Sequence, residues 1–418
     1  MNKAKSFDVS KHTVWEAWIR VKANRGAPGI DDESIAEFEE NLKDNLYKLW
    51  NRMSSGSYFP FPVKVVEIAK KDGTKRRLGV PTVSDRVAQM VAKLHLEPKL
   101  EKHFHKDCYG YRCGKSAIEA VGVTRMRCWR YNWLLEFDIK AAFDSIDHEL
   151  LFKALRRHTN CKWILLYIER WLKVPFQHQD GRVEERTVGL PQGGVISPLL
   201  MNLFLHYVFD CWMEKHYRQT PFARYADDGV VHCNTESEAF KLQTALVERF
   251  AECKLKLHPD KTKVIYCRDS NRKGRGRHES FDFLGYTFRP RTAQNKQGAL
   301  FTSFCPAMSK TAVKGIRKVV RRTWKLHRRV DKSLIDLSRM FNPAIRGWFE
   351  YYKHYHCSAL YALSESLNRA LQKWAMHKDK RFRGHRTRAG KWLKEVAERE
   401  PRLFAHWEFA PVFTTTGR

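Results

Sequence analysis

The chain has 418 residues, 43% of them hydrophobic, which is enough for a large buried core and two to four structural units. Lys and Arg number 77 against 46 Asp and Glu, so the formal net charge is +31. Because so much positive charge repels itself in a compact chain, a polyanionic partner such as nucleic acid is favoured. The composition excludes a disordered or fibrous protein.

Neither a signal peptide nor a membrane span is expected. The first eleven residues are polar, and no stretch approaches the length needed to cross a bilayer. The positive charge runs along the whole chain instead of beside one apolar segment, which disfavours binding to a membrane surface. The ten cysteines include no C-x-x-C pair, which fits reduced thiols in a cytosol. We therefore expect a cytoplasmic protein without a membrane partner.

The first hundred residues are predicted to form helices and one hairpin. Apolar spacing predicts three helices, over residues 13–21, 35–49 and 87–98. The third is expected to stop near Pro98, because proline lacks a backbone N–H. Between the second and third helices, residues 63–69 and 76–80 alternate as strands, joined by a turn at Asp72-Gly73.

The middle of the chain mixes strands with helices. Strands are predicted over residues 134–139, 174–179, 181–188, 264–267 and 281–288, and helices over 148–157, 197–213 and 236–253. Asp147 is expected to cap the helix at 148–157, since its carboxylate can accept a free backbone N–H at the helix start.

The character of the chain changes after Lys310. Apolar residues then fall on one helical face, at Val313, Ile316, Val320 and Trp324. Basic residues cover the other faces, at Lys314, Arg317, Lys318, Arg321, Arg322, Lys325, Arg328 and Arg329. We predict a boundary near residues 300–310 and a basic helical unit beyond it, so the fold class is α+β with an appended α unit.

Tyr225-Ala226-Asp227-Asp228 lies between two apolar segments. Neighbouring carboxylates repel each other, so they either lie exposed at a turn or bind cations. Asp228-Gly229 is itself a two-residue turn signal, so a plain hairpin tip also explains the motif.

Asp138 ends an apolar predicted strand, and it can be a solvated strand end or part of the same site. If its strand and the Asp227-Asp228 hairpin are neighbours in one sheet, three carboxylates meet. Oxygen ligands of this kind suit Mg²⁺, and a pair of such ions can activate a 3′-hydroxyl and stabilise a leaving pyrophosphate.

Four sequence blocks occur in a characteristic order. They are Phe137-Asp138-Ile139-Lys140-Ala141-Ala142-Phe143-Asp144, Leu190-Pro191-Gln192-Gly193-Gly194-Val195-Ile196-Ser197-Pro198, Tyr225-Ala226-Asp227-Asp228 and Phe283-Leu284-Gly285-Tyr286. Upstream blocks agree, at residues 25–31, 78–87 and 109–112. The series resembles the reverse transcriptases, and more narrowly the bacterial group II intron-encoded reverse transcriptases or maturases, over residues 13–360.

The resemblance implies roles for individual residues. Asp138, Asp227 and Asp228 would be the catalytic, metal-binding aspartates, and the backbone carbonyl of Ile139 a further ligand. The cofactor would be Mg²⁺, with Mn²⁺ as a possible substitute.

The resemblance also implies a nucleotide site. Lys70 and Arg76 would hold the incoming triphosphate, although on residues alone they are simple surface charges. Phe143, next to Ala142, takes the sugar-gate position that selects deoxynucleotides, and an aromatic core residue would look the same. Pro191 and Gln192 would lie against the nucleotide or template.

The implied architecture is a right-hand polymerase with fingers, an antiparallel palm sheet and a basic helical thumb. Residues 1–130 would form an N-terminal extension and fingers, 131–300 the palm with some fingers elements interleaved, and 305–418 the thumb, or domain X, and tail. The thumb would clamp a duplex through its phosphates and grip intron RNA.

The implied function is RNA-directed DNA synthesis, combined with help for a group II intron in splicing and retrohoming. The partners would be intron RNA, an RNA template with a DNA primer, deoxynucleoside triphosphates and target DNA, bound by a monomer or homodimer. No cysteine follows Cys357 before the last residue, Arg418, so we expect the endonuclease-lacking type. Two alternatives stay open: a free-standing or defence-associated reverse transcriptase, and an RNA-binding splicing factor with little polymerase activity.

Overall fold

The structure is a computed structural model that describes residues 6–69 and 75–409. Its contacts divide the chain into two compact units, which we call unit 1 and unit 2. Unit 1 comprises Met1–Ala120 and Leu135–Lys263, and unit 2 comprises Val121–Leu134 and Val264–Arg418. Residues 264–300, which the sequence analysis groups with the palm, thus pack with the helices that follow them.

Helices dominate the start of unit 1. They are α1 (Lys11–Ala23), α2 (Ile35–Glu40), α3 (Leu42–Ser55) and α4 (Val83–Glu101). The single helix predicted over 35–49 is wrong, because the chain breaks at Asn41 between α2 and α3. The predicted stop near Pro98 is also wrong. Helix α4 continues to Glu101, where Leu96 and Leu100 are fully buried, so packing outweighs the bond that proline cannot make.

The first sheet of unit 1 has the strand order β2-β1-β4-β5. Its strands are β1 (Val63–Ala69), β2 (Lys75–Val80), β4 (Phe176–Gln177) and β5 (Val183–Glu184). Both predicted hairpins are confirmed as antiparallel pairs, although β4 and β5 are shorter than expected. The Asp72-Gly73 turn and Lys70 lie outside the described residues.

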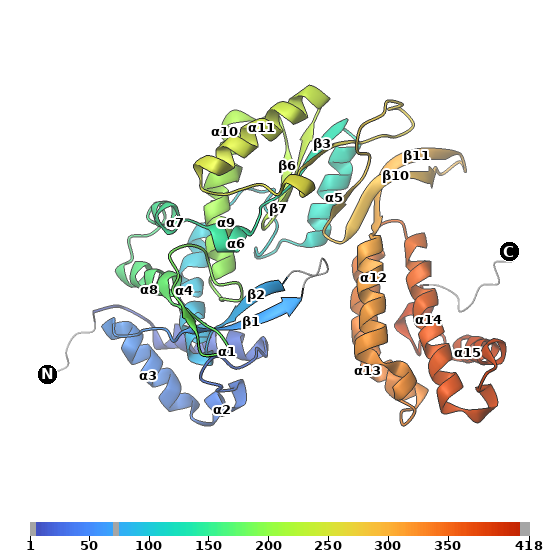
Figure 1. The fold of residues 1–418 in the computed structure, drawn as a ribbon, viewed down its shortest axis with the longest axis horizontal. Helices are drawn as coiled ribbons and strands as arrows, with labels where there is room; N and C mark the ends of the chain where they lie inside the picture. The colour runs from blue at the N-terminus through green and yellow to red at the C-terminus, as the bar shows by residue number, and fades with distance from the viewer. Residues whose placement is uncertain (1–5, 70–74, 410–418) are drawn as a thin grey trace. The chain divides into compact units, whose positions relative to one another are not determined.

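The second sheet has the order β6-β7-β3-β8. Its strands are β6 (Phe222–Tyr225), β7 (Asp228–Cys233), β3 (Trp133–Asp138) and β8 (Lys263–Tyr266). Phe137 of β3 lies fully buried against Phe209 and Phe250, with ring centroids 4.9 Å and 5.9 Å away. This aromatic core holds the inner face of the sheet against helices on one side (Figure 1).

The remaining helices between residues 117 and 261 lie mostly in unit 1. They are α5 (Ala117–Cys128), α6 (Ala142–Ser145), α7 (His148–Leu155), α8 (Lys162–Lys173), α9 (Ser197–Leu205), the π-helix η1 (His206–Asp210), α10 (Cys211–His216), α11 (Glu236–Glu252) and the 3₁₀ turn η2 (Pro259–Lys261). The predicted cap of α7 is confirmed, since Asp147 Oδ1 accepts the Leu150 N–H at 2.9 Å. The helix predicted over 197–213 is interrupted by the π-helical turn.

Unit 2 contains a three-stranded antiparallel sheet in the order β11-β10-β9. Its strands are β9 (Phe281–Phe283), β10 (Tyr286–Gln294) and β11 (Leu300–Met308). The sequence predicts a boundary near residues 300–310. Residues 300–308 form instead the strand β11, which pairs with β10 from Tyr286↔Met308 to Gln294↔Leu300.

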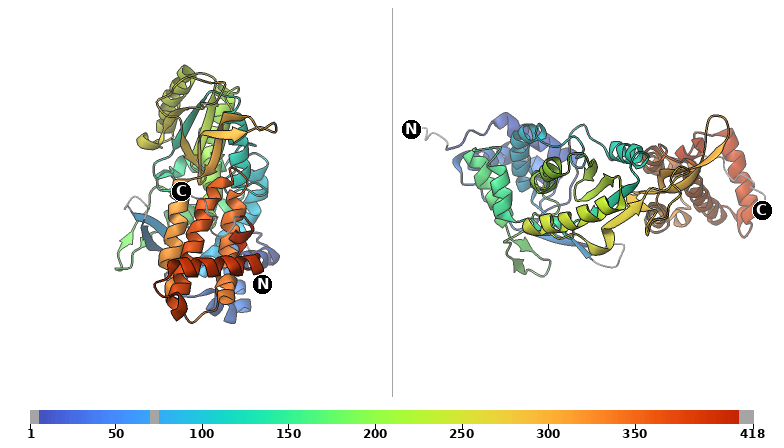
Figure 2. Two further views of the ribbon diagram at one scale, coloured as in Figure 1. Left: turned by 90° about the vertical axis from the view of Figure 1, so that its right-hand side faces the viewer. Right: turned by 90° about the horizontal axis from the view of Figure 1, so that it is seen from above.

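Helices complete unit 2. They are α12 (Lys310–Val319), η3 (Val320–Trp324), η4 (Leu326–Arg328), α13 (Leu334–Tyr352), α14 (Ser358–Lys378), η5 (Lys380–Phe382), α15 (Arg386–Arg399) and η6 (Ala405–Glu408). Helices α12, α13 and α14 run side by side, and α15 crosses their ends (Figures 1 and 2). In their core, Trp324 stacks on Phe341 and Trp348, with centroids 4.2 Å and 5.2 Å apart.

Together these elements form a mixed α+β chain, in which helices and strands alternate up to β11 and only helices follow. None of the described helices is long and apolar enough to cross a membrane. The cysteines of the described residues are not joined in disulfides.

Candidate active site

The β6–β7 hairpin turns at Ala226 and Asp227. Tyr225 pairs with Asp228, so these two residues form the turn, and Ala226 takes a φ of 56°. The expected turn at Asp228-Gly229 is therefore wrong, because both residues belong to β7. Gly229 serves close packing: a Cβ at this position would lie 2.3 Å from the ring of Phe137 on β3.

Strands β7 and β3 are neighbours, as the sequence analysis required for three carboxylates to meet. Asp138 is the last residue of β3, and Glu136 lies on the same face because strand residues alternate. Glu136 raises the pKa of Asp228 by its charge, which places this fourth carboxylate near the site. Sequence reasoning missed Glu136, although the strand alternation was the available signal.

Two of the crowded carboxylates, Asp227 and Asp228, have raised pKa values. Burial raises the pKa of Asp227, and the neighbouring charge of Asp138 adds to this. Burial raises the pKa of Asp228 well above its usual value, with further contributions from Glu136, Asp138 and Asp227. In both cases the charged form is disfavoured by lost hydration and by like charges, so a nearby cation would stabilise it.

Lys261 of η2 is a cation that bonds to this cluster through Asp138. Its ammonium lies 2.8 Å from Asp138 Oδ2, and this hydrogen bond raises the pKa of Lys261. The lysine reaches the site from η2, 123 positions along the chain. Sequence reasoning missed it, because no local pattern distinguishes it from the other lysines.

The backbone around Ile139 is fixed by the segment before η2. The carbonyl of Asp138 accepts the His258 N–H at 2.8 Å, and the N–H of Lys140 donates to the Lys256 carbonyl at 2.8 Å. Ile139 itself is 2% exposed. The end of β3 is therefore held in place next to the carboxylates.

Phe143 and Ala142 lie on the short helix α6, just after β3. Ala141, before this helix, takes a φ of 49°, which turns the chain sharply away from the strand. Both Ala142 and Phe143 are buried. The Phe143 carbonyl accepts the Leu190 N–H at 2.6 Å, so α6 is joined to the segment that contains Pro191, which is also buried.

Arg76 of β2 is connected to the same segment through Gln192. Its Nε donates to Gln192 Oε1 at 2.6 Å, and Gln192 Nε2 donates to Asp144 Oδ2 at 3.2 Å. Arg76 also lies close enough to Asp227 for its charge to lower the pKa of that carboxyl. The structure thus brings Arg76 and Gln192 to the edge of the carboxylate cluster, while Lys70 lies outside the described residues.

Arg224 supports the turn from inside. It is fully buried, three residues before Asp227, and donates to the Ala226 carbonyl at 3.0 Å. Its Nε and Nη2 donate to the two oxygens of Asp210, at 2.8 Å and 2.6 Å. The sequence did not reveal this pair, although an arginine within an apolar strand signals a buried partner.

The donor set suits a hard divalent cation. Asp138, Asp227 and Asp228 offer carboxylate oxygens, and burial together with neighbouring like charges raises the pKa of the last two. Over the described ranges, no group of three His, Cys, Asp or Glu residues already has the spacing of a metal cluster. With Lys261 on Asp138, the carboxylates would have to rearrange slightly to share an ion.

Acidic strand ends in an α+β chain, with basic residues supplied by a neighbouring hairpin, are typical of enzymes that transfer phosphoryl or nucleotidyl groups. The family model described as reverse transcriptase (RNA-dependent DNA polymerase) matches residues 68–288, more than half of the chain. The chain belongs to this family. A second model, the group II intron maturase-specific domain, matches residues 313–392.

Curated relatives agree with both matches. Protein YkfC of Escherichia coli is 30% identical over 306 residues, which cover 63% of this chain and 77% of YkfC. The group II intron-encoded protein LtrA of Lactococcus lactis is 32% identical over 193 residues, 46% of this chain and 32% of LtrA. Nuclear intron maturase 4 of Arabidopsis thaliana is 24% identical over 174 residues, 42% of this chain and 22% of that protein. The chain is thus a member of the reverse transcriptase family, and its relatives include group II intron-encoded proteins, although it spans only part of the longer ones.

Proposed function

We propose that this protein extends a DNA primer on an RNA template, using two Mg²⁺ ions held by Asp138, Asp227 and Asp228, with Mn²⁺ as a substitute. The observation that carries the proposal is the meeting of these carboxylates at the ends of β3 and the β6–β7 hairpin. The raised pKa values of Asp227 and Asp228 support it, since the charge of a cation would offset the repulsion between these carboxylates.

The protein groups would share the work in a simple way. The three aspartates and the Ile139 carbonyl would hold the ions, which when bound activate the primer hydroxyl and neutralise the leaving pyrophosphate. Lys261 would have to release Asp138 Oδ2 to make that oxygen available. The bonds from His258 and Lys140 would keep the end of β3 still during this change.

Arg76 and Lys70 would hold the triphosphate. The guanidinium of Arg76 donates to Gln192 and acts on Asp227, so a phosphate placed between them would take over this donor. Gln192, released from Arg76, would then contact the nucleotide or template beside Pro191. Arg76→Ala should therefore raise the KM for nucleotide more than it lowers kcat.

Phe143, with Ala142, would exclude the 2′-hydroxyl and so select deoxynucleotides. Its ring is fixed by burial and by the bond between its carbonyl and Leu190. Phe143→Ala should reduce the preference for deoxynucleotides over ribonucleotides by about 10- to 100-fold. Unchanged discrimination in a single-nucleotide incorporation assay would contradict this role and reopen RNA synthesis as an activity.

The central test is primer extension on an RNA template with Mg²⁺. Asp227→Asn should lower the single-turnover rate at least about thousandfold, because several kcal/mol of charge stabilisation are lost. Asp260→Asn is the matched control, since Asp260 is an exposed carboxylate on η2. Equal extension by the wild type and Asp227→Asn would overturn the polymerase proposal and favour a splicing factor with an inactive core.

We also propose that the chain binds its intron RNA to aid splicing and retrohoming to target DNA. The maturase-specific match and the exposed basic residues of α12 and η3 support this. In functional terms, we assign residues 1–130 to an N-terminal extension and fingers, 131–300 to the palm and 305–418 to the thumb. The protein would act in the cytoplasm. It would act as a monomer or homodimer.

A filter-binding assay would test the intron proposal. Labelled intron RNA should stay bound when unrelated structured RNA is added in about hundredfold excess. Loss of preference under this competition would favour a free-standing or defence-associated reverse transcriptase instead.

A further inference from the structure

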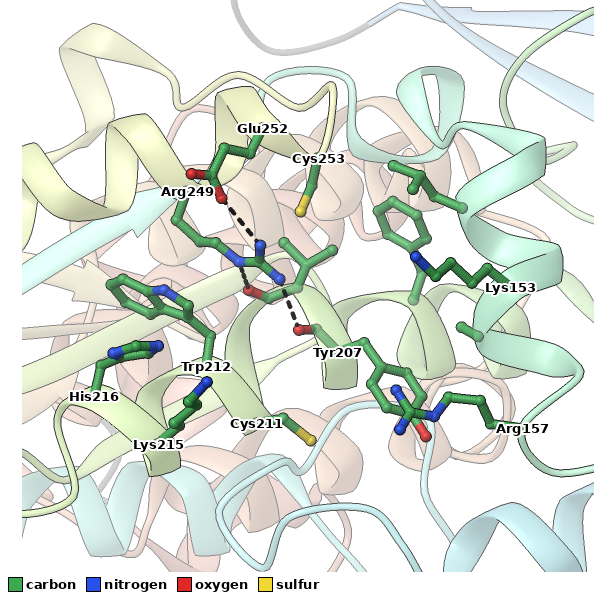
Figure 3. Close-up of a pocket in the computed structure, with 14 residues that line it drawn as sticks. Lys153, Arg157, Tyr207, Cys211, Trp212, Lys215, His216, Arg249, Glu252 and Cys253 are labelled. Carbon is green, nitrogen blue, oxygen red and sulfur yellow. Dashed lines mark hydrogen bonds and ion pairs between the residues drawn. The ribbon is translucent and has the colours of Figure 1, made fainter.

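A cavity of about 460 Å³ lies in unit 1, lined by residues that the proposed polymerase reaction does not use. Its walls come from α7 and the residue after its C-terminal turn, from η1 and α10, and from α11. Figure 3 shows Lys153 and Arg157 on one side and Trp212, Lys215 and His216 on the other. The pocket is therefore both basic and aromatic.

The π-helix η1 forms one wall, and Arg249 fixes its shape. The N–H of Cys211 donates to the carbonyl of His206, five residues back. The Arg249 guanidinium donates to the carbonyls of Tyr207 and Val208 at 3.2 Å and 3.0 Å, and to Glu252 at 3.1 Å (Figure 3). The wider turn thus directs two carbonyls toward a side-chain donor, an arrangement that often accompanies functional sites.

With Arg249 bound in the wall, three cations remain for a ligand. Lys153, Arg157 and Lys215 are exposed, and none of them forms an ion pair with a carboxylate of residues 6–69 or 75–409. Glu252 is the carboxylate in the lining, and it is bonded to Arg249. The pocket therefore presents uncompensated positive charge, which attracts an anion.

The aromatic groups narrow the class of anion. Arg157 lies over the ring of Tyr207, 5.3 Å from its centroid, and keeps its N–H edge for a phosphate. On the opposite side, Trp212 is partly exposed and packs beside His216, with centroids 5.7 Å apart. A flat aromatic face next to cations binds a stacked base and its phosphate, as single-stranded nucleic acid sites do. An acidic peptide would use the cations but not the ring.

We propose that this pocket binds a nucleoside phosphate, presented by an unpaired nucleotide of an RNA strand. The base stacks on Trp212, and the phosphate is held by Lys153, Arg157 and Lys215. A cavity of about 460 Å³ has room for one nucleotide. The site would give the protein a second hold on structured RNA, distinct from the carboxylate cluster.

The test is photo-crosslinking of the full chain with a 12-nucleotide single-stranded RNA that carries 8-azidoadenosine, followed by mass spectrometry of the labelled peptides. Labelling of the segment with Tyr207 and Trp212 is expected. The double variant Lys153→Glu with Lys215→Glu should reduce this labelling at least tenfold. The matched pair Lys162→Glu with Lys241→Glu, also exposed lysines but outside the lining, should retain it.

Binding of the same RNA, measured by fluorescence anisotropy over a range of salt concentrations, gives a second readout. Loss of the contact with this phosphate should reduce the slope of log affinity against log salt by about 0.7. Trp212→Leu should weaken binding about tenfold without changing that slope, because stacking carries no charge. Equal slopes for the wild type and the Lys153→Glu, Lys215→Glu variant would overturn the proposal.

Further arms separate the sources of the ligand and the two functions. Labelling by free 8-azido-AMP but not by the RNA would overturn RNA as the source, and equal competition by polyglutamate would overturn the nucleotide class. Asp227→Asn should retain pocket labelling, and the Lys153→Glu, Lys215→Glu variant should retain primer extension on a short template. The pocket proposal can therefore hold even if the polymerase proposal fails. Primer extension by the Lys153→Glu, Lys215→Glu variant would also show that this variant folds.

Discussion

Asp210 and Asp228 are two carboxylates of unit 1 with opposite electrostatic surroundings. Asp210 is fully buried, and Arg224 donates to both of its oxygens. Although burial opposes charge, this guanidinium lowers the pKa of Asp210. Asp228 lies among Glu136, Asp138 and Asp227, and burial with these like charges raises its pKa well above the usual value. One carboxylate is paired with a full positive charge, whereas the charged form of the other is disfavoured by burial and by like charges.

Asp85 shows that hydrogen bonds from neutral donors do not by themselves lower the pKa of a buried carboxylate. Its carboxylate accepts hydrogen bonds from Tyr58, Trp171 and Gln89 at 2.7, 2.7 and 2.9 Å, yet burial still raises its pKa. Among Asp85, Asp210 and Asp228, only Asp210, which is bonded to the full positive charge of Arg224, has a lowered pKa. A carboxylate cluster whose pKa values stay raised although Lys261 bonds to Asp138 is therefore a candidate ligand site, whereas a bonded pair such as Asp210 with Arg224 indicates structural support.

The largest effect on stability is expected where the pair is broken. Arg224→Met should lower the free energy of unfolding by about 3–5 kcal/mol, because Asp210 would stay buried and unpaired. Arg218→Met, at an exposed arginine, is the control and should change little. Chemical denaturation gives the values, and adding Asp210→Leu to Arg224→Met should recover much of the loss. No recovery would show that the arginine acts mainly through the Ala226 carbonyl.

The carboxylate cluster should gain stability from its ion. At free Mg²⁺ of about one hundred times its dissociation constant, the free energy of unfolding should rise by about 2.7 kcal/mol per site. Thermal unfolding with and without EDTA checks this in the wild type and in Asp227→Asn. A Mg²⁺ effect of the same size in both would mean that the ion binds elsewhere.

Removing a charge from the carboxylate cluster should stabilise the metal-free protein. Asp228→Asn keeps the shape of the side chain but removes one repelling carboxylate, so the free energy of unfolding in EDTA should rise by about 1 kcal/mol at pH 8. The same variant should lose primer extension. A lower free energy of unfolding in Asp228→Asn would contradict the idea that the charge of Asp228 destabilises the metal-free fold and is kept for function.

The smallest expected effect is the pH dependence of the stability that Asp228→Asn gains in EDTA. The pKa of Asp228 is raised on folding, so the folded protein binds more protons than the unfolded chain between the ordinary Asp value and the raised one. Stability therefore falls as pH rises through this window, and Asp228→Asn escapes that fall. The difference between variant and wild type in EDTA should be larger at pH 8 than at pH 5. A constant difference would place the cause in packing.

Local patterns predicted much of this site. Apolar runs around Asp138 and around Asp227 predicted strands at β3 and at the β6–β7 hairpin, and the cap at Asp147 followed from one residue type at a helix start. The order of the blocks predicted the family that the matched models show. These features depend on neighbours within a few positions, so the sequence alone determines them.

Tertiary structure decided what lies between distant segments. Asp228-Gly229 reads locally as a turn, but close packing of Gly229 on Phe137 draws both residues into β7 and moves the turn to Ala226-Asp227. Lys261 reaches Asp138 across 123 positions, and Arg224 finds Asp210 across 14. Burial and charge pairing depend on contacts between distant segments, so they produce no regular spacing of residues in the sequence. The sequence by itself therefore determined the three aspartates as candidates, and only the fold decided that Glu136 lies near them and that Arg224 neutralises Asp210 from within.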